Sequence, residues 1–185
     1  MIKKTFSYTL VVCSIAASVI ITSCNNHKDT DKEEVATNRI FADYHYALDS
    51  IIKSKEGIVS GIELGQSVKL IPAREVNQAV EKTNDHITFE QTIDKVSKYT
   101  ITYAFENDTI TEMEVLITSQ SGDEGDKILT DLKNYYTKKY TAPIMDKGYF
   151  VFNCFDSKKQ NFTITLTDNS GASNSVIDMF VYREK

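Results

Sequence analysis

The chain has no tryptophan, only two prolines and only three cysteines. It also lacks a cluster of lysine and arginine, and its 26 acidic residues outnumber its 21 basic residues, which gives a formal net charge of −5. Nucleic-acid binding depends largely on basic side chains that neutralise phosphates, so this composition argues against a nucleic-acid partner. The cysteines are too few for a disulfide framework or a thiolate metal site.

Catalytic patterns are also missing. No serine lies in a nucleophile elbow or in a Ser-x-x-Lys pattern suited to acyl transfer. His45 and Asp49 are four residues apart and can meet on one helical face, but metal binding or acid–base catalysis would need further partners. We therefore expect a surface His–Asp contact, and we predict a protein that is not an enzyme and that carries no metal or cofactor.

The N-terminal segment has the three parts of a secretory signal peptide. Two lysines precede an apolar stretch from residue 10 to residue 21, and small residues follow. The stretch is short for a transmembrane helix, which needs about 20 apolar residues. Its end, Ile21-Thr22-Ser23-Cys24, resembles the lipobox of bacterial lipoproteins, in which an aliphatic residue and two small residues precede the lipidated cysteine. The alternative is an uncleaved signal anchor with an incidental cysteine.

The resemblance to lipoproteins implies a location. Residues 1–23 would be removed as a signal peptide, and Cys24 would receive acyl chains, of which two or more give stable membrane attachment. In that family an aspartate after the cysteine commonly retains the protein at the inner membrane, and Asn25 stands here instead. The resemblance therefore implies a cell-envelope protein, anchored through acylated Cys24 to the outer membrane rather than the inner one.

The remainder of the chain indicates a polar tether followed by one domain. Residues 24–36 are polar and lack a hydrophobic period, which predicts a solvated tether, and residues 37–185 carry the periodic patterns of a single α+β domain. Spacings of three and four predict helices at about 37–54, 72–82 and 121–140. Alternation predicts strands at 86–93, 99–105, 111–119, 149–155, 161–167 and 175–183. These elements predict an antiparallel sheet with packed helices, and their order allows two halves that each contain a helix and three strands.

Two of the predicted strands are apolar on both faces. One face carries Phe150, Phe152 and the remaining cysteine, Cys154, which we interpret as a buried core thiol. The residues on the second face of these strands are Tyr149, Val151, Phe155, Val176, Phe180 and Tyr182. Either a helix or the other half of the domain covers this second face, or it is a partner-binding groove or a dimer surface.

Two hypotheses for function follow. The first is a membrane-anchored, non-enzymatic binding or accessory module with a protein partner in the envelope, which exposure of the aromatic face would favour. The alternative is an immunity or inhibitor lipoprotein that neutralises a toxin or an envelope hydrolase, because a negative surface can steer a basic partner. A cluster of exposed carboxylates beside the aromatic face, expected from residues 106–114 and 121–126, would favour the alternative.

Overall fold

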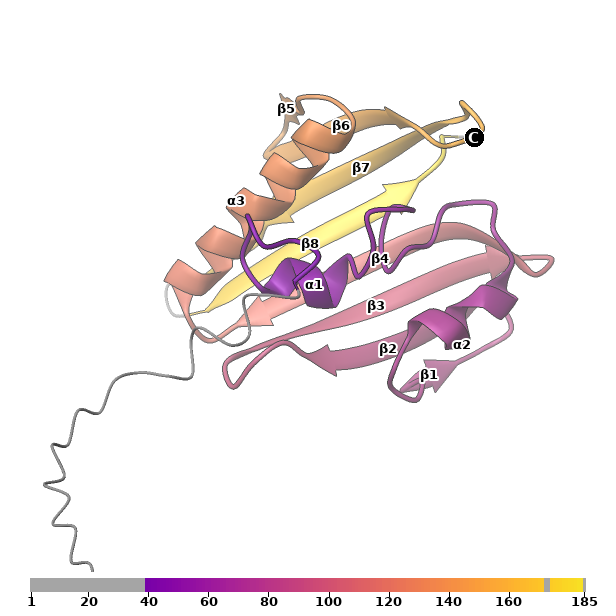
Figure 1. The fold of residues 1–185 in the computed structure, drawn as a ribbon, viewed down its shortest axis with the longest axis horizontal. Helices are drawn as coiled ribbons and strands as arrows, with labels where there is room; N and C mark the ends of the chain where they lie inside the picture. The colour runs from indigo at the N-terminus through magenta and orange to yellow at the C-terminus, as the bar shows by residue number, and fades with distance from the viewer. Residues whose placement is uncertain (1–38, 172–173, 185) are drawn as a thin grey trace, which may run out of the picture.

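The computed structural model describes residues 39–171 and 174–184 (Figure 1). The predicted signal peptide, Cys24 and the tether at residues 24–36 lie outside the described residues. Within the described ranges, every helix is too short or too polar to cross a membrane.

One antiparallel sheet of eight strands forms the body of the domain, in the order β1-β2-β3-β4-β8-β7-β6-β5. The central pair is β4 and β8, with Val115 opposite Met179. On either side of this pair the strands continue as meanders, β4-β3-β2 and β8-β7-β6. The strands are β1 (Glu81–Lys82), β2 (His86–Thr92), β3 (Ser97–Glu106), β4 (Thr109–Ser119), β5 (Ile144–Asp146), β6 (Tyr149–Phe155), β7 (Asn161–Asp168) and β8 (Ser175–Tyr182).

The longest described helix, α3 (Gly122–Lys139), lies across one face of the sheet (Figure 1). Ser121 caps it, because its side chain accepts a hydrogen bond from the backbone N–H of Glu124. The short helix α1 (Ala47–Ile51) lies beside α3, and η2 (Val68–Leu70) runs into α2 (Ile71–Arg74). We call this face of the molecule the helix side.

The core lies between the sheet and the helix side, and it contains three large, fully buried tyrosines. Each phenol hydroxyl donates a hydrogen bond inside the protein: Tyr99 to the carbonyl of Ser50, Tyr103 to the carboxylate of Glu75, and Tyr136 to the carbonyl of Ile58. Buried hydroxyls without partners would be costly, so these bonds fix α1 and the segments around Ile58 and Glu75 against the sheet and α3.

The predicted fold class is supported only in its coarse form. The domain is mostly sheet with minor helical content, whereas two of the three predicted helices are much shorter than expected. The helix predicted at 37–54 is helical only over Ala47–Ile51. Asp49 accounts for this difference, because its carboxylate accepts hydrogen bonds from the Arg39 side chain and from the backbone N–H of Phe41 and so holds the chain before α1 in turns.

The helix predicted at 72–82 ends at Arg74, and the chain continues into the edge strand β1. Glu75 is the reason, because it adopts an extended conformation and its side chain turns into the core. Val76 and Val80, which suggested a buried helical stripe, are 85% and 63% exposed. The short edge strand β5 was not predicted.

Candidate functional site

The second face of the sheet, which we call the outer face, is open. α1, α2 and α3 all lie in front of the strands in Figure 1, and no described element packs on the opposite face. Alternation along β8 confirms the arrangement, because Ile177, Met179 and Val181 are buried whereas Phe180 is exposed. Among the described residues, therefore, no helix covers the outer face, and the two halves lie side by side in one sheet rather than one over the other.

Three of the predicted residues form the centre of an apolar patch on the outer face. Val151 on β6 lies opposite Thr165 on β7, and Thr165 lies opposite Phe180 on β8. Because neighbouring strands are about 4.8 Å apart, Val151 and Phe180 are separated by roughly 10 Å across Thr165. Tyr182 follows two residues after Phe180 and pairs with Thr163, which is buried despite its place on this face.

The other three predicted residues surround this patch at different distances. Tyr149 precedes Val151 by two residues on β6 and lies opposite Thr167. Its exposed fraction is 45%. Phe155 is 63% exposed but lies at the far end of β6, and Val176 lies near the opposite end of the sheet, next to Thr118. The outer face therefore brings Val151, Phe180, Tyr182 and Tyr149 together, and it leaves Phe155 and Val176 at the periphery.

Carboxylates lie directly beside this patch. Glu112 and Glu114 on β4 pair with Tyr182 and Phe180, so part of the acidic segment expected at 106–114 does reach the aromatic face. The segment 121–126 does not, because it begins α3 on the helix side. Sequence reasoning missed Asp178, although alternation along β8 places it on the same face as Phe180.

One oxygen of the Asp178 carboxylate lacks a hydrogen-bond donor in the described part of the chain. Its Oδ1 atom is buried and has no hydrogen-bond partner among the described residues. Burial raises the pKa of Asp178 above its ordinary value, and burial together with the nearby Asp178 charge raises the pKa of Glu114. Both shifts are those expected for partly desolvated carboxylates, and neither side chain forms an ion pair with a described residue.

Asp178→Asn tests this electrostatic description. A carboxyl whose pKa is higher in the folded than in the unfolded state destabilises the protein as pH rises from about 4, the unfolded pKa, through the folded pKa. We expect the variant to have a higher free energy of unfolding than the parent at pH 7 and no such advantage at pH 3, measured by urea denaturation. Asp168→Asn, on an exposed residue at the end of β7, is the matched control. An advantage of equal size at both pH values would contradict the description.

The predicted contact between His45 and Asp49 is wrong. His45 does not contact Asp49, which bonds Arg39 instead. The Nε2 atom of His45 lies 2.8 Å from a carboxylate oxygen of Glu124, and Nδ1 accepts a hydrogen bond from the backbone of Ala47. The Nε2 contact therefore joins the start of the domain to the first turn of α3, whereas the Nδ1 contact is local to the start of α1. In the described part of the chain, no group of three or more potential metal-ligating side chains gathers.

Cys154 belongs to the core, as interpreted from the sequence. It is buried, its thiol approaches the carbonyl of Phe152 at 3.6 Å, and burial raises its pKa to about 12. A thiol with such a pKa is protonated at neutral pH and is a poor nucleophile.

Comparison with protein families, with curated proteins and with solved structures finds no match to the chain. The outer face and the lipobox resemblance at the N-terminus are therefore the two features from which a function can be argued.

Proposed function

We propose that the chain is a membrane-anchored lipoprotein of the cell envelope that acts as a non-enzymatic binding or accessory module. The anchor is acylated Cys24, which follows from the lipobox resemblance, and Asn25 favours the outer membrane over the inner. The docking surface is the outer face, centred on Phe180.

The observation that carries this proposal is a sheet face on which aromatic side chains adjoin carboxylates that pair with no cation in the described part of the chain. Phe180 is exposed, Tyr182 is half-buried, and Asp178 keeps a buried oxygen unpaired. Interfaces concentrate their binding energy in aromatic and arginine residues within desolvated centres. A guanidinium from a partner can stack on an aromatic ring while it donates to a carboxylate. The proposed partner is thus a protein that presents a basic side chain among apolar ones.

The outer-face carboxylates give specific support to a second function, that of an immunity or inhibitor lipoprotein. Glu112 and Glu114 add negative charge beside the aromatic patch, which suits electrostatic steering of a basic toxin or hydrolase. The two functions differ in their effect on the activity of the partner. An inhibitor abolishes the activity of its partner, with an association rate that falls steeply with salt, whereas an accessory module remains bound to an active partner.

The proposed domain consists of two halves, each with a helix and three strands. The meanders β4-β3-β2 and β8-β7-β6 are arranged symmetrically about the central pair, which supports a domain of two helix-plus-three-strand halves. The halves differ in their helices, because α1 has five residues and α3 has eighteen.

Phe180→Ala and Asp178→Lys, made separately, test the docking surface. The acylated protein is extracted in mild detergent, and co-purifying proteins are quantified by mass spectrometry. We expect a partner that the parent retains and that each variant loses at least tenfold, which corresponds to a loss of about 1.4 kcal/mol or more in binding. Val76→Ala, at a residue that is 85% exposed and away from the outer face, should leave recovery unchanged.

The anchor is tested in the same cells by palmitate labelling of the parent and of Cys24→Ser. Label on the parent alone supports the anchor, and an unlabelled parent contradicts it. A partner recovered equally from the parent, Phe180→Ala and Asp178→Lys contradicts the docking surface even if the anchor is correct.

A further inference from the structure

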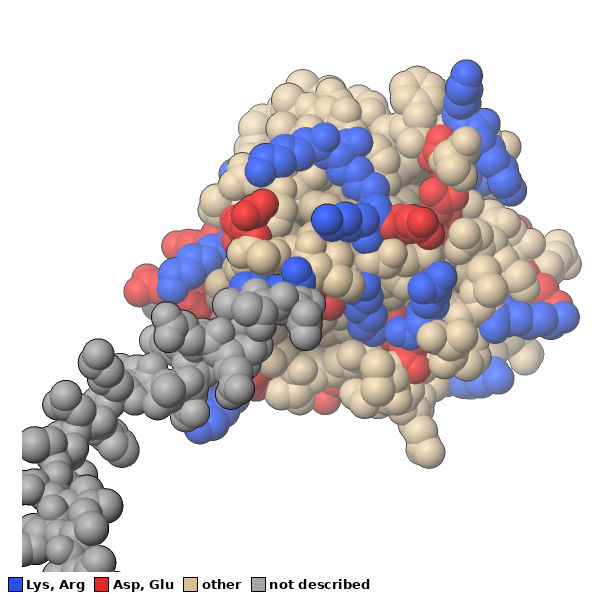
Figure 2. Space-filling view, viewed as in Figure 1, with Lys and Arg blue, Asp and Glu red and all other residues tan. Residues whose placement is uncertain are grey.

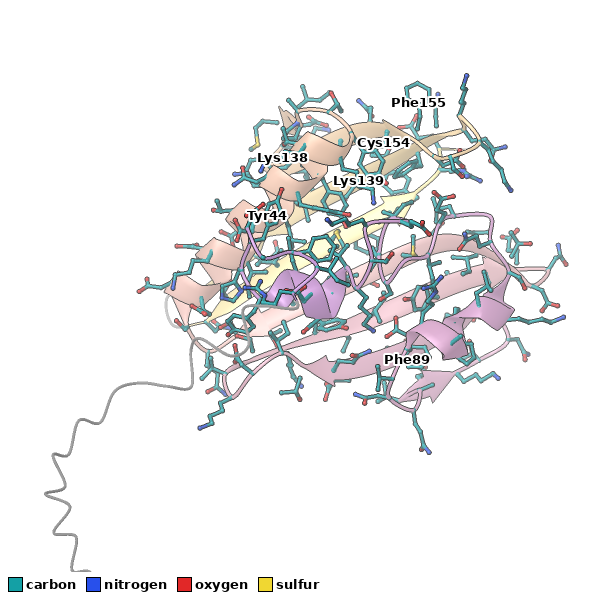
Figure 3. The ribbon with its side chains drawn as sticks, viewed as in Figure 1. Tyr44, Phe89, Lys138, Lys139, Cys154 and Phe155 are labelled. Carbon is teal, nitrogen blue, oxygen red and sulfur yellow. The ribbon has the colours of Figure 1, made fainter. Side chains whose placement is uncertain are left out.

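A pair of cavities lies on the helix side, opposite to the outer face. The first, of about 290 Å³, is bounded by residues 40–44, by Lys55 and by Tyr135, Lys138 and Lys139 of α3. The second, of about 560 Å³, shares Lys55 and Lys139, adds Arg74 and the acidic residues Glu56, Glu63 and Asp156, and reaches the end of β6 at Phe155. Figure 3 shows Tyr44, Lys138 and Lys139 near one another along α3.

Aromatic rings form the wall of the first cavity. The ring of Tyr135 meets that of Phe41 at 5.3 Å between centroids and that of Tyr44 at 6.1 Å, both nearly perpendicular. The ammonium of Lys138 lies 5.0 Å from the centroid of the Tyr44 ring. The cavity therefore combines a rigid apolar wall with a positive charge at its rim.

Lys139 has a structural role between the two cavities. Its ammonium donates hydrogen bonds to the carbonyls of Lys55 and Gly57 and to the hydroxyl of Tyr135, and burial lowers its pKa. These bonds fix the loop that carries Lys55 against α3. The side chains of Lys55 and Lys138, in contrast, are exposed, and neither forms an ion pair among the described residues.

The helix side and the outer face differ in charge. Lysines and arginines extend across the helix side with acidic residues between them (Figure 2). In the first cavity, three lysines stand against one carboxylate, that of Asp43. The centre of the outer face carries Glu112, Glu114 and Asp178. An anionic surface would therefore attract the mouth of the first cavity and repel the centre of the outer face.

The N-terminal end of the domain lies at the first cavity. Arg39 begins the described residues, and residues 40–44 line the cavity. Arg39 is fifteen residues after Cys24. A chain of that length spans at most about 50 Å. Acylation of Cys24 would thus keep the mouth of this cavity within reach of lipid headgroups.

We infer that Lys55 and Lys138, at the rim of the helix-side cavities, dock on anionic phospholipid headgroups of the membrane to which Cys24 is attached. This docking turns the outer face away from the membrane, toward its protein partner. The inference rests on the proposed lipid anchor and adds the orientation of the domain to it. Tyr44 and Phe41 provide an amphipathic wall of the kind that suits the headgroup region.

The test uses the acylated full-length mature protein in two kinds of vesicle, phosphatidylcholine alone and phosphatidylcholine with phosphatidylglycerol. Each sample receives a brief pulse of an amine-acetylating reagent, and mass spectrometry gives the acetylation rate of every lysine. We expect Lys55 and Lys138 to react at least fivefold more slowly on the anionic vesicles, with the protection removed by high salt. Lys98, an exposed residue of β3 on the outer face, should react equally on both.

A charge-reversal pair sharpens the test. Lys55→Glu should reduce the slower acetylation of Lys138 on anionic vesicles, and Lys138→Glu that of Lys55, whereas Lys95→Glu, at an exposed turn, should preserve both. Equal rates for Lys138 on both vesicles, or equal protection of Lys138 and Lys98, would overturn the inference while the anchor stands. A protein that fails to float with the vesicles would overturn the anchor and the inference together.

Discussion

Glu75→Ala is expected to lower the free energy of unfolding by about 3–5 kcal/mol, because it removes one partner of a buried ionic network. The side chain of Glu75 is fully buried. Its carboxylate accepts hydrogen bonds from the Tyr103 hydroxyl, from the Lys53 ammonium and from the Gln91 amide, each at 2.5 Å. Without the carboxylate, these donors and one positive charge are left facing the core.

Urea denaturation of Glu75→Ala measures this loss. Tyr103→Phe is the matched control, because it removes one hydroxyl from the same network and keeps the ring, and we expect it to cost about 1–2 kcal/mol. The role assigned to Glu75 would be wrong if Glu75→Ala were as stable as Tyr103→Phe. It would also be wrong if the variant unfolded in a separate step that left the sheet intact.

Gly125→Ala is expected to destabilise the domain by about 2–3 kcal/mol, although alanine is the better helix former by about 1 kcal/mol. Gly125 is buried where α3 crosses β8. A Cβ atom added there would lie 1.9 Å from Oγ and 2.1 Å from Cβ of Ser175. The helix would have to move away from the sheet along the contact that forms the core.

A double variant separates this clash from other effects. With Ser175→Gly, the nearest remaining atom is the Cα of Ser175 at 3.6 Å, so Gly125→Ala should cost little in that background. Gly122→Ala is the control in the same helix, because nothing lies within 4 Å of its added Cβ, and it should be neutral or slightly stabilising. If thermal denaturation showed the same change for Gly122→Ala and Gly125→Ala, close packing of α3 on β8 would be refuted.

Local chemistry explains the parts of the fold that the sequence predicts well. Alternation placed Tyr99, Ile101 and Tyr103 on the core face of β3, where all three are buried. Asn107 and Asp108 both adopt positive φ, as the tight turn of a hairpin requires, and they lie between the strands predicted at 99–105 and 111–119. These features depend on neighbours within a few positions, which is the range over which a sequence pattern is informative.

The parts that were mispredicted depend on residues far apart in the chain. The first helix is short because Asp49 binds residues that precede it by eight and ten positions. The second is short because Glu75 reaches the sheet at Gln91 and Tyr103. Helical periodicity alone carries no information about such contacts, so tertiary structure overrides it.

The candidate site was predictable in its residues but not in its geometry. Alternation identified Tyr149, Val151, Phe180 and Tyr182 as members of a second apolar face. The pairing of β4 with β8 brings Glu114 beside Phe180, and that register joins segments more than sixty residues apart. The unpaired oxygen of Asp178 follows from the same pairing, so only the structure could reveal it.

Photo-crosslinking from two positions tests most directly the central claim, which is that the outer face docks a protein partner. A photoreactive amino acid replaces Thr165, between Val151 and Phe180 on the outer face, or Thr130, exposed on α3, in the acylated full-length protein in cells. The account predicts one protein adduct from position 165 that Phe180→Ala abolishes, and no such adduct from position 130. The absence of an adduct from position 165, or the same adduct from both positions, would contradict it.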